Sequence, residues 1–380
     1  MSALTKMRID DFATMKYGKM PPKNMVSDEG YPIYSGYRVT GFAKEYLYKE
    51  PELIVVARGV GGTGDVKISP PEAWITNLSI VLSLSPELVD KKFLYYRLGR
   101  EPLKERLNTG AAQAQITIEN LRSYEIDLPD LISQRRIASI LTAYDELIAN
   151  NRRRIALLEE STRLLYREWF VHFRFPGHEH VKIIDSVPEG WEQKNLFDCV
   201  DVLSGGTPKT TVPAFWGDEI PFFTPKDTGD GPYTHDTEKM ITEEGLKRCN
   251  SKLYEKDTLF VTARGTVGKI RLAQRPMAMN QSCYALRSKT YLDQAYLYFG
   301  VTEQVAHMKS RAVGAVFDAI IVDTFKNIPF LLPAKETAED YSEIARDTLR
   351  QIDLLSSQNR QLINARDLLL PRLMDGRLEI

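Results

Sequence analysis

The chain has 380 residues, of which 43% are hydrophobic and 27% charged, and its formal net charge at pH 7 is −1. These fractions are typical of a globular protein, and no apolar run approaches the roughly 18 residues that a transmembrane helix needs. Cys199, Cys249 and Cys283 lie far apart with no C-x-x-C pair, so we expect reduced thiols and a soluble, cytoplasmic protein without membrane contact. A near-neutral total permits a local basic surface without requiring one, so charge alone does not identify the partner.

The chain repeats its own pattern. An Ala-Arg-Gly triplet ends an apolar run, an Asn enters a second apolar stretch, and a Gly-Ala pair and a Leu-Pro pair follow; all of these occur twice. The matched points are residues 57–59 and 263–265, 77 and 280, 110–111 and 314–315, and 128–129 and 332–333, at spacings of 206, 203, 204 and 204. Two globular units copied in tandem explain such spacings.

Each unit is expected to consist mostly of short strands. In the first, an apolar strand over residues 53–58 is followed by a glycine-rich turn and a returning strand over 66–68. The second repeats this hairpin over 258–264 and 269–272, and each unit later carries one helical stretch, at about 90–107 and 292–311. The pattern predicts an α+β fold with curved, barrel-like sheets and few helices.

The early part of the second unit is longer. Its Gly-Gly-Thr-Pro-Lys run at 205–209 matches residues 18–22 at an offset of only 187, which predicts about seventeen extra residues between Lys226 and Tyr254. An insertion in a loop alters the surface of one copy and leaves its core unchanged.

Two long helices join and follow the units. From Ile137 to Trp169, steps of four and three visit ten positions of which eight are apolar, and the same steps run from Tyr341 to Leu373. Such seams pack by knobs into holes, and we expect these two to form an antiparallel coiled coil, roughly 48 Å long over the first. Asn151 and Asn359 fall within the seams, where a buried polar pair would fix the register; the alternative is that one or both face solvent.

These features divide the chain into four segments. Residues 1–130 form the first unit, 131–172 the central helix, 173–335 a linker with the second unit, and 336–380 the last helix. His172, His178 and His180 cluster in the linker, but without Cys or a second ligand pair we interpret them as surface residues, and we expect no metal site.

Glycine-rich loops raise the question of a nucleotide site. Gly59, Gly61 and Gly64 satisfy G-x-G-x-x-G, yet a strand pattern follows them in place of the helix whose N-terminus holds a pyrophosphate. The second copy, at 265–270, lacks the leading glycine and the Ser or Thr of a phosphate-binding loop. We interpret both as hairpin turns. Several catalytic signatures, H-E-x-x-H and G-x-S-x-G among them, are absent from the sequence, which favours a recognition protein over an enzyme.

Taken together, these residues resemble the specificity subunit of type I restriction–modification systems. The segments that carry the resemblance, in order along essentially the whole chain, are residues 110–116, 124–129, 133–141, 188–191, 205–208 and 369–376. The first unit departs from the pattern, since it has neither the Pro-Glu-Gly-Trp nor the Gly-Gly-Thr-Pro of the second.

The resemblance implies a function. Each unit would be a target recognition domain for one half of a split, asymmetric site in double-stranded DNA, and the coiled coil would set the unread gap. The subunit would be non-catalytic and bind no cofactor itself. Two methyltransferase subunits would supply S-adenosylmethionine, and restriction subunits would supply ATP- and Mg-dependent chemistry.

Candidate DNA contacts are polar and basic groups in turns and loops, because such side chains read base edges and phosphates. They are Lys19, Lys23, Tyr37, Arg38, Arg58, Gln113 and Gln115 in the first unit, and Thr207, Lys209, Lys226, Arg264, Thr266 and Lys269 in the second. Arg58 and Arg264 occupy matched positions, so they either contact DNA or brace the hairpin in both units.

Two alternatives remain open. One is an enzyme of nucleic acids or nucleotides that uses the glycine loops. The other is a coiled-coil scaffold that presents two domains to protein partners without reading DNA.

Overall fold

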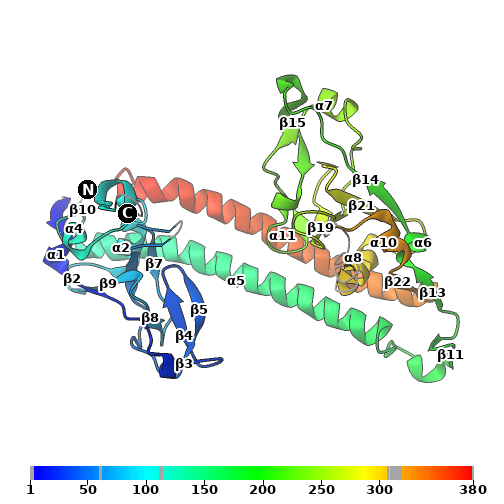
Figure 1. Ribbon diagram of the computed structural model, residues 1–380, viewed down its shortest axis with the longest axis horizontal. Coiled ribbons are helices and arrows are strands. Elements are labelled where there is room, and N and C mark those ends of the chain that lie inside the picture. Colours follow the sequence, from blue (N-terminus) through cyan, green and yellow to red (C-terminus); the bar gives the residue numbers. More distant parts are fainter. Residues whose placement is uncertain (1–3, 60–61, 111–113, 306–307, 309–318, 379–380) are drawn as a thin grey trace. The chain divides into compact units, whose positions relative to one another are not determined.

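The computed structural model describes residues 4–59, 62–110, 114–305, 308 and 319–378 (Figure 1). The chain divides into two compact units, one of residues 1–148 with 361–380 and one of residues 149–360. Helices α5 (Leu131–Phe170) and α11 (Lys335–Met374) each contribute to both units. None of the helices within the described ranges is long and apolar enough to cross a membrane.

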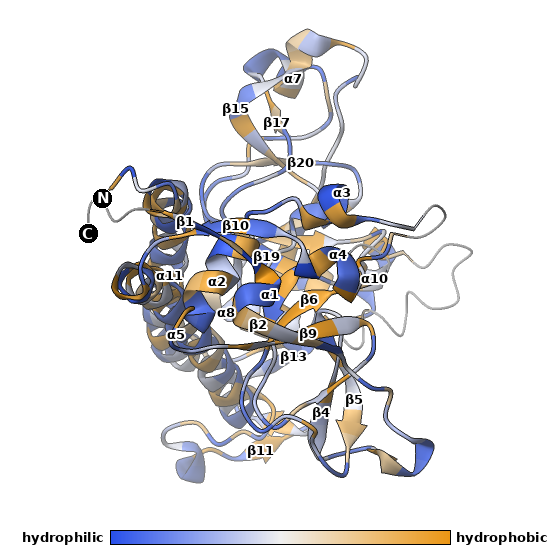
Figure 2. Ribbon diagram, turned by 90° about the vertical axis from the view of Figure 1, so that its left-hand side faces the viewer, coloured by the Kyte–Doolittle hydropathy of each residue, from blue (hydrophilic) through white to orange (hydrophobic). Residues whose placement is uncertain are grey.

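The first unit is built from two four-stranded sheets and a strand pair. The sheets have the strand orders β2-β9-β6-β7 and β3-β5-β4-β8, and β1 pairs with β10. Its elements before α5 are β1 (Thr5–Arg8), α1 (Ile9–Phe12), β2 (Ala13–Tyr17), η1 (Lys23–Met25), β3 (Val26–Ser27), β4 (Tyr31–Ser35), β5 (Arg38–Ala43), β6 (Leu53–Val56), β7 (Val66–Ile68), β8 (Trp74–Ile75), β9 (Ser79–Leu84), α2 (Lys91–Leu98), α3 (Leu103–Leu107), α4 (Ile118–Arg122) and β10 (Glu125–Leu128). Strand β6 consists of apolar residues (Figure 2). It is fully buried, as expected for a central strand, and β9 beside it is buried over its first four residues.

The second unit repeats this topology. Its sheets have the orders β14-β21-β18-β19-β16 and β17-β15-β20, and β13 pairs with β22. Its elements between α5 and α11 are η2 (His178–His180), β11 (Ile183–Ile184), β12 (Val187–Pro188), β13 (Glu192–Asn195), α6 (Leu196–Cys199), β14 (Val200–Ser204), η3 (Pro213–Phe215), β15 (Trp216–Phe223), η4 (Pro225–Asp227), β16 (Tyr233–Thr234), β17 (Met240–Ile241), α7 (Glu243–Lys247), β18 (Leu259–Thr262), β19 (Ile270–Ala273), β20 (Ala278–Met279), β21 (Cys283–Ser288), α8 (Gln294–Glu303), α10 (Val322–Lys326) and β22 (Pro329–Leu332). The expected α+β tandem repeat is confirmed.

The extra residues of the second unit add structure at one sheet edge. They lie between β15 and β18, where β17 pairs with β15 as β5 pairs with β4. The elements without a counterpart are therefore β16 and α7. Strand β16 runs parallel to β19 and gives this sheet its fifth strand.

One matched point of the sequence comparison is wrong by a residue. The backbone N–H of Thr76 donates to the Tyr34 carbonyl, and the N–H of Asn280 donates to the Phe223 carbonyl at the same place in the second unit. Asn280 is therefore the counterpart of Thr76, and the residue that matches Asn77 is Gln281. Asn77 and Asn280 are identical in type, but the strand pairing, which the sequence does not reveal, shifts their correspondence by one residue. Of the matched Gly-Ala pairs, residues 111 and 314–315 lie outside the described residues.

The single helix expected at 90–107 is also wrong, because it is interrupted. Helix α2 ends at Leu98 and α3 begins at Leu103. Gly99 and Pro102 lie between them, and a proline inside a helix removes a hydrogen bond and clashes with the preceding turn. In the second unit α8 ends at Glu303, and most of the remaining predicted stretch lies outside the described residues.

The heptad seams of α5 and α11 face each other within each unit. Every seam position from Ile137 to Trp169 and from Tyr341 to Leu373 is buried or partly buried. Residue numbers rise along one helix as they fall along the other. The facing pairs are Asp145 with Arg366 in the first unit, and Asn151 with Asn359 and Thr162 with Thr348 in the second. The helices are therefore antiparallel, as expected.

Both cores combine the start of one long helix with the end of the other. In the first unit the core includes Leu141 from early α5 and Met374 from the end of α11. In the second it includes Phe170 from the end of α5 and Tyr341 from early α11. Apolar side chains from both helices thus complete each globular unit.

Candidate nucleic-acid interface

In each unit, the loops that carry most of the candidate residues leave the main sheet at the same end of its strands. In the second unit Ser204 at the end of β14 is opposite Tyr284, and Thr262 at the end of β18 is opposite Cys283 at the start of β21. Because neighbouring strands are antiparallel, loops 205–209, 263–269 and 280–282 emerge at the same edge. We call these loops, and the equivalent 18–22, 57–65 and 76–78 of the first unit, the loop edge.

The loop edge of the second unit presents polar and basic side chains to solvent. Its exposed candidates are Thr207, Lys209, Arg264, Thr266 and Lys269. The turn after β15 lies beside them, since a Cβ on Gly265 would be 3.9 Å from the Cβ of Pro225. This turn carries the exposed Lys226, whose Nζ lies 3.4 Å from a carboxylate oxygen of Glu238.

The first unit brings its candidates together in the same way. Arg58 forms an isolated antiparallel bridge with Gln115, and both are partly buried. The turn after β4 carries Tyr37, whose ring packs against Gly62 of the β6–β7 loop. The guanidinium carbon of Arg38 lies 5.7 Å from the centroid of that ring.

Of the other three candidates of the first unit, one lies in loop 18–22 of the loop edge, one lies in η1, and one is not described. Lys19 is exposed directly after β2, and its carbonyl accepts a hydrogen bond from Trp74 Nε1 at 2.7 Å. Lys23 is exposed in η1. Gln113 lies outside the described residues.

Two glycines at matched positions allow the loops to approach closely. A Cβ on Gly18 would be 2.4 Å from the carbonyl oxygens of Ile75 and Thr76, and one on Gly205 would be 2.2 Å from that of Asn280. No side chain fits at such distances, so only glycine permits this contact. The loop after β2 is thereby held against the loop that precedes β9, and the loop after β14 against the loop that precedes β21.

The main chain braces the hairpins, which leaves the two matched arginine side chains available. In the first unit the N–H groups of Ala57 and Arg58 both donate to the Leu78 carbonyl, and in the second those of Ala263 and Arg264 donate to the Ser282 carbonyl. Among the described residues no ion pair or side-chain hydrogen bond involves Arg58 or Arg264. Neither guanidinium group is needed to hold its hairpin.

The glycine-rich loops are hairpin turns. Strand β6 pairs antiparallel with β7 directly across residues 57–65, and β18 pairs with β19 across 263–269. Gly64 and Gly268 take positive φ angles of 91° and 75°, which these tight turns require. Because a strand follows each loop, neither supplies a helix N-terminus for a phosphate.

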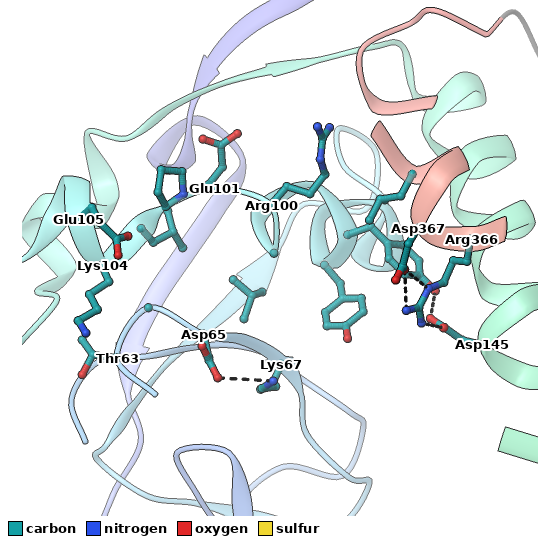
Figure 3. Close-up of a pocket in the computed structure, with 18 residues that line it drawn as sticks. Thr63, Asp65, Lys67, Arg100, Glu101, Lys104, Glu105, Asp145, Arg366 and Asp367 are labelled. Carbon is teal, nitrogen blue, oxygen red and sulfur yellow. Dashed lines mark hydrogen bonds and ion pairs between the residues drawn. The ribbon is translucent and has the colours of Figure 1, made fainter. Parts of the chain in front are cut away.

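A cavity of about 450 Å³ in the first unit is lined by acidic and basic side chains, several of which pair with one another (Figure 3). Asp65 pairs with Lys67 at 3.6 Å, and Arg366 pairs with both Asp145 and Asp367. The hydroxyl of Tyr96 donates to Asp145; burial and this hydrogen bond raise the tyrosine pKa. Such mutual pairing is typical of a structural network.

A second cluster of charged and titratable side chains joins the added segment of the second unit to α11. His235 lies with its Nε2 3.7 Å from Oδ1 of Asp353, and Lys256 Nζ lies 3.0 Å from Oδ2 of the same carboxylate. Both ring nitrogens of His235 are buried without a hydrogen-bond partner among the described residues. Burial lowers the pKa of His235 and so favours its neutral form. Within the same described part of the chain, no group of three or more His, Cys, Asp or Glu side chains could hold a metal ion.

The candidates chosen from the sequence omit two amides on the loop edge, Asn77 and Gln281. Gln281 is exposed, and its side-chain carbonyl accepts a hydrogen bond from the Thr207 hydroxyl. Matching the copies by strand pairing, and not by residue identity, would have revealed an amide at this position in both units.

Comparison with known proteins identifies relatives over the whole chain. The chain is 27% identical over 197 residues to the type I restriction enzyme MjaIX specificity subunit of Methanocaldococcus jannaschii, a match that covers 51% of this chain and 45% of that protein. It is 21% identical over 398 residues to the MjaVIII specificity subunit of the same organism, covering 98% and 92%. With the HindI specificity subunit of Haemophilus influenzae it shares 23% identity over 327 residues, covering 70% and 71%.

A solved structure has the same fold. The crystal structure of the type I restriction–modification S subunit from M. genitalium superposes with a TM-score of 0.70 at 20% identity, covering 98% of this chain and 96% of that one. The family model described as "type I restriction modification DNA specificity domain" matches residues 1–160 and 188–365. Because these two matches account for most of the chain, the protein belongs to the family of type I restriction–modification DNA specificity domains.

Proposed function

We propose that this chain is the DNA sequence-specificity subunit of a type I restriction–modification complex. Each unit reads one half of a bipartite, asymmetric target through its loop edge, and the paired helices set the gap between the halves. The observation that carries the proposal is the pair of loop edges. They share their backbone geometry and differ in the side chains that they present.

The difference is clearest in the turn after β4 and its counterpart after β15. The strand pairing matches Tyr34 with Phe223, and the turns that follow these two residues carry Tyr37 and Arg38 in the first unit and Lys226 and Asp227 in the second. Oδ2 of Asp227 accepts a hydrogen bond from the main-chain N–H of Thr224 at 2.8 Å. The guanidinium group of Arg38 instead lies over the ring of Tyr37. Direct readout depends on the donors and acceptors presented to base edges, so the two units are suited to different half-sites.

The candidate residues divide between the two units as the proposal requires. In the first unit the proposed contacts are Lys19, Lys23, Tyr37, Arg38, Arg58, Gln113 and Gln115, and in the second they are Thr207, Lys209, Lys226, Arg264, Thr266 and Lys269. Lysines and arginines contact phosphates, while the amides and the arginines beside the hairpins also reach base edges.

The subunit itself is non-catalytic in this proposal. Two methyltransferase subunits bind it and supply S-adenosylmethionine for adenine methylation, and restriction subunits supply the ATP- and Mg-dependent steps. Exposed apolar residues on the long helices, such as Leu157 and Leu354 at 63% and 60% exposure, are available for these partners.

The test is co-expression of the chain with a methyltransferase subunit, followed by affinity purification and methylome sequencing of the host. The expected result is a stable complex and adenine methylation at one bipartite motif. Failure to co-purify, with no methylated motif, would falsify the proposal. A stable complex without salt-dependent DNA affinity would instead indicate a scaffold for proteins alone.

A further inference from the structure

Gln281 lies on the loop edge of the second unit with its amide already oriented. The residue precedes β21 in loop 280–282, and its side chain is exposed. The hydroxyl of Thr207, on the loop that follows β14, donates a hydrogen bond to the side-chain carbonyl oxygen, Oε1. The amide nitrogen Nε2 makes no hydrogen bond within the described part of the chain. In this arrangement Oε1 is bonded to Thr207 and the two N–H donors of Nε2 are left unpaired.

The loop beneath Gln281 is held at several points. Asn280 donates its N–H to the Phe223 carbonyl at 3.0 Å, and its side-chain Oδ1 accepts from the N–H of Ser282 at 3.1 Å. The backbone of Gly205 packs directly on the Asn280 carbonyl. A side chain on such a rigid base loses less conformational freedom on binding than one on a mobile loop.

The first unit has an amide at the same position. Strand pairing makes Asn77 the counterpart of Gln281, and Asn77 is partly buried. The residue that matches Thr207 is Met20, which has no hydroxyl to donate. The two units therefore keep the same functional group at this position and differ in side-chain length and in the group that orients it.

We infer that Gln281 reads an adenine in the second half-site from the major groove, with Thr207 as its positioning residue. Glutamine matches adenine because its carbonyl accepts from N6–H and its NH₂ donates to N7. The Thr207 hydroxyl uses one lone pair of Oε1, which leaves the other for N6–H, and Nε2 is free for N7. Asn77 is the corresponding reader in the first unit. This inference rests on the proposed function, since it assumes one half-site per unit.

The experiment uses the complex of the full chain with its methyltransferase subunit. Binding is measured against duplexes that carry every single-base change in the target, and against duplexes with 7-deazaadenine at each adenine. The Gln281→Ala complex should lose roughly 5- to 150-fold in affinity for the cognate duplex, the range of a bidentate contact between a side chain and a base. The loss should map to one A·T pair of the second half-site, where 7-deazaadenine weakens wild type but not the variant.

Matched variants separate reading from folding. Gln193→Ala removes an exposed glutamine on β13, away from the loop edge, and should bind as wild type does. Thr207→Val should show a smaller loss at the same A·T pair, and Thr207→Ser should restore it. Asn77→Ala should alter preference only in the first half-site. Unchanged preferences at the other base pairs of the second half-site show that the second unit of the Gln281→Ala complex remains folded.

The outcomes distinguish this inference from the proposed function. If the wild-type complex prefers no sequence, the proposed function fails. If the wild type is specific and Gln281→Ala keeps the same preference at every position, only the inference about Gln281 is overturned. It is also overturned if Gln281→Ala weakens binding equally to all sequences, which would indicate a phosphate contact, or if the lost preference is for a base other than adenine.

Discussion

Asn151 on α5 donates a hydrogen bond from its Nδ2 to Oδ1 of Asn359 on α11, at 3.0 Å, and both side chains are buried within an otherwise largely apolar seam. A single polar pair at such positions can align two helices, because any slipped register would bury each amide against apolar groups. The alignment costs stability that a wholly apolar seam would have.

We therefore predict opposite effects from single and double substitutions here. Asn151→Leu alone leaves the buried Asn359 without its partner and should cost about 1–3 kcal/mol in the free energy of unfolding. Adding Asn359→Leu should recover that loss but allow slipped registers. Denaturant unfolding measures the first effect, and disulfide trapping between Thr162→Cys and Thr348→Cys, whose hydroxyls lie 3.2 Å apart, measures the second. If the disulfide forms as completely with both Asn→Leu substitutions as it does with both asparagines present, the asparagine pair does not set the register.

The second prediction concerns the proposed spacer. Seven residues added at facing points of both long helices preserve the heptad phase and lengthen the pair by about 10 Å. At 3.4 Å per base pair, the gap in the recognised sequence should grow by about three base pairs, or binding should be lost. Methylome sequencing reports the gap directly. A methylated motif with its original gap would exclude the helices as the spacer.

The third prediction tests the close approach of the loops. Gly205→Ala places a methyl group about 2.2 Å from the Asn280 carbonyl oxygen, so the loops must separate, at a cost of about 1–3 kcal/mol. Affinity for the second half-site should fall while the first half-site is read as before. Gly229→Ala is the control, because nothing lies within 4 Å of a Cβ there. Equal affinity of the two variants for the second half-site would show that the close approach of Gly205 to the Asn280 carbonyl is not required.

The fourth prediction separates phosphate contacts from base contacts. Lys269 is exposed beside the β18–β19 turn, and its side chain has no partner among the described residues. Lys269→Ala should weaken binding to cognate and unrelated duplexes alike and reduce the slope of log K against log salt by about 1. Lys194→Ala on β13, where the lysine pairs with Glu192 at 3.1 Å, should leave the slope unchanged. A selective loss on the cognate duplex would instead assign Lys269 to a base.

The fifth prediction follows from the buried His235. Burial holds its pKa in the folded protein below the unfolded value of about 6.5, so the folded state favours the neutral ring. Above that pH both states are neutral; as the pH falls through it, the unfolded chain binds a proton that the folded chain resists, and stability decreases. Melting temperatures between pH 8 and pH 5.5 should therefore fall less steeply for His235→Asn than for wild type. His180→Asn, at a histidine whose side chain is 84% exposed, should follow the wild-type curve.

The long helices and the central hairpins could be predicted from the sequence because their signals are local. A 3.5-residue period sustained from Ile137 to Trp169 and two buried apolar strands with glycine turns need no knowledge of distant partners. The apolar pattern continues across the break between α2 and α3, so periodicity alone does not predict it, although Gly99 and Pro102 mark the interruption.

The composition of the loop edge could be predicted only in part. Arg58 and Arg264 stood out because the repeat itself placed them in matched turns. Gln281 did not, because its partner Thr207 lies 74 residues away and the two meet only through the pairing of β14 with β21. The matching of Asn77 with Gln281 depends on hydrogen bonds from neighbouring strands, which residue identity does not reveal.

The division of the core between distant segments also governs the order in which the chain can fold during synthesis. Residues 149–360 form a continuous stretch and contain all that their own core requires. The unit that begins the chain needs Leu373 and Met374, which are buried in its core and are made more than two hundred residues after Ile148. Domains generally fold as units once their residues are available. The ribosome therefore starts the first unit early and completes it after the second, and its unfinished apolar surface must meanwhile be kept from aggregation.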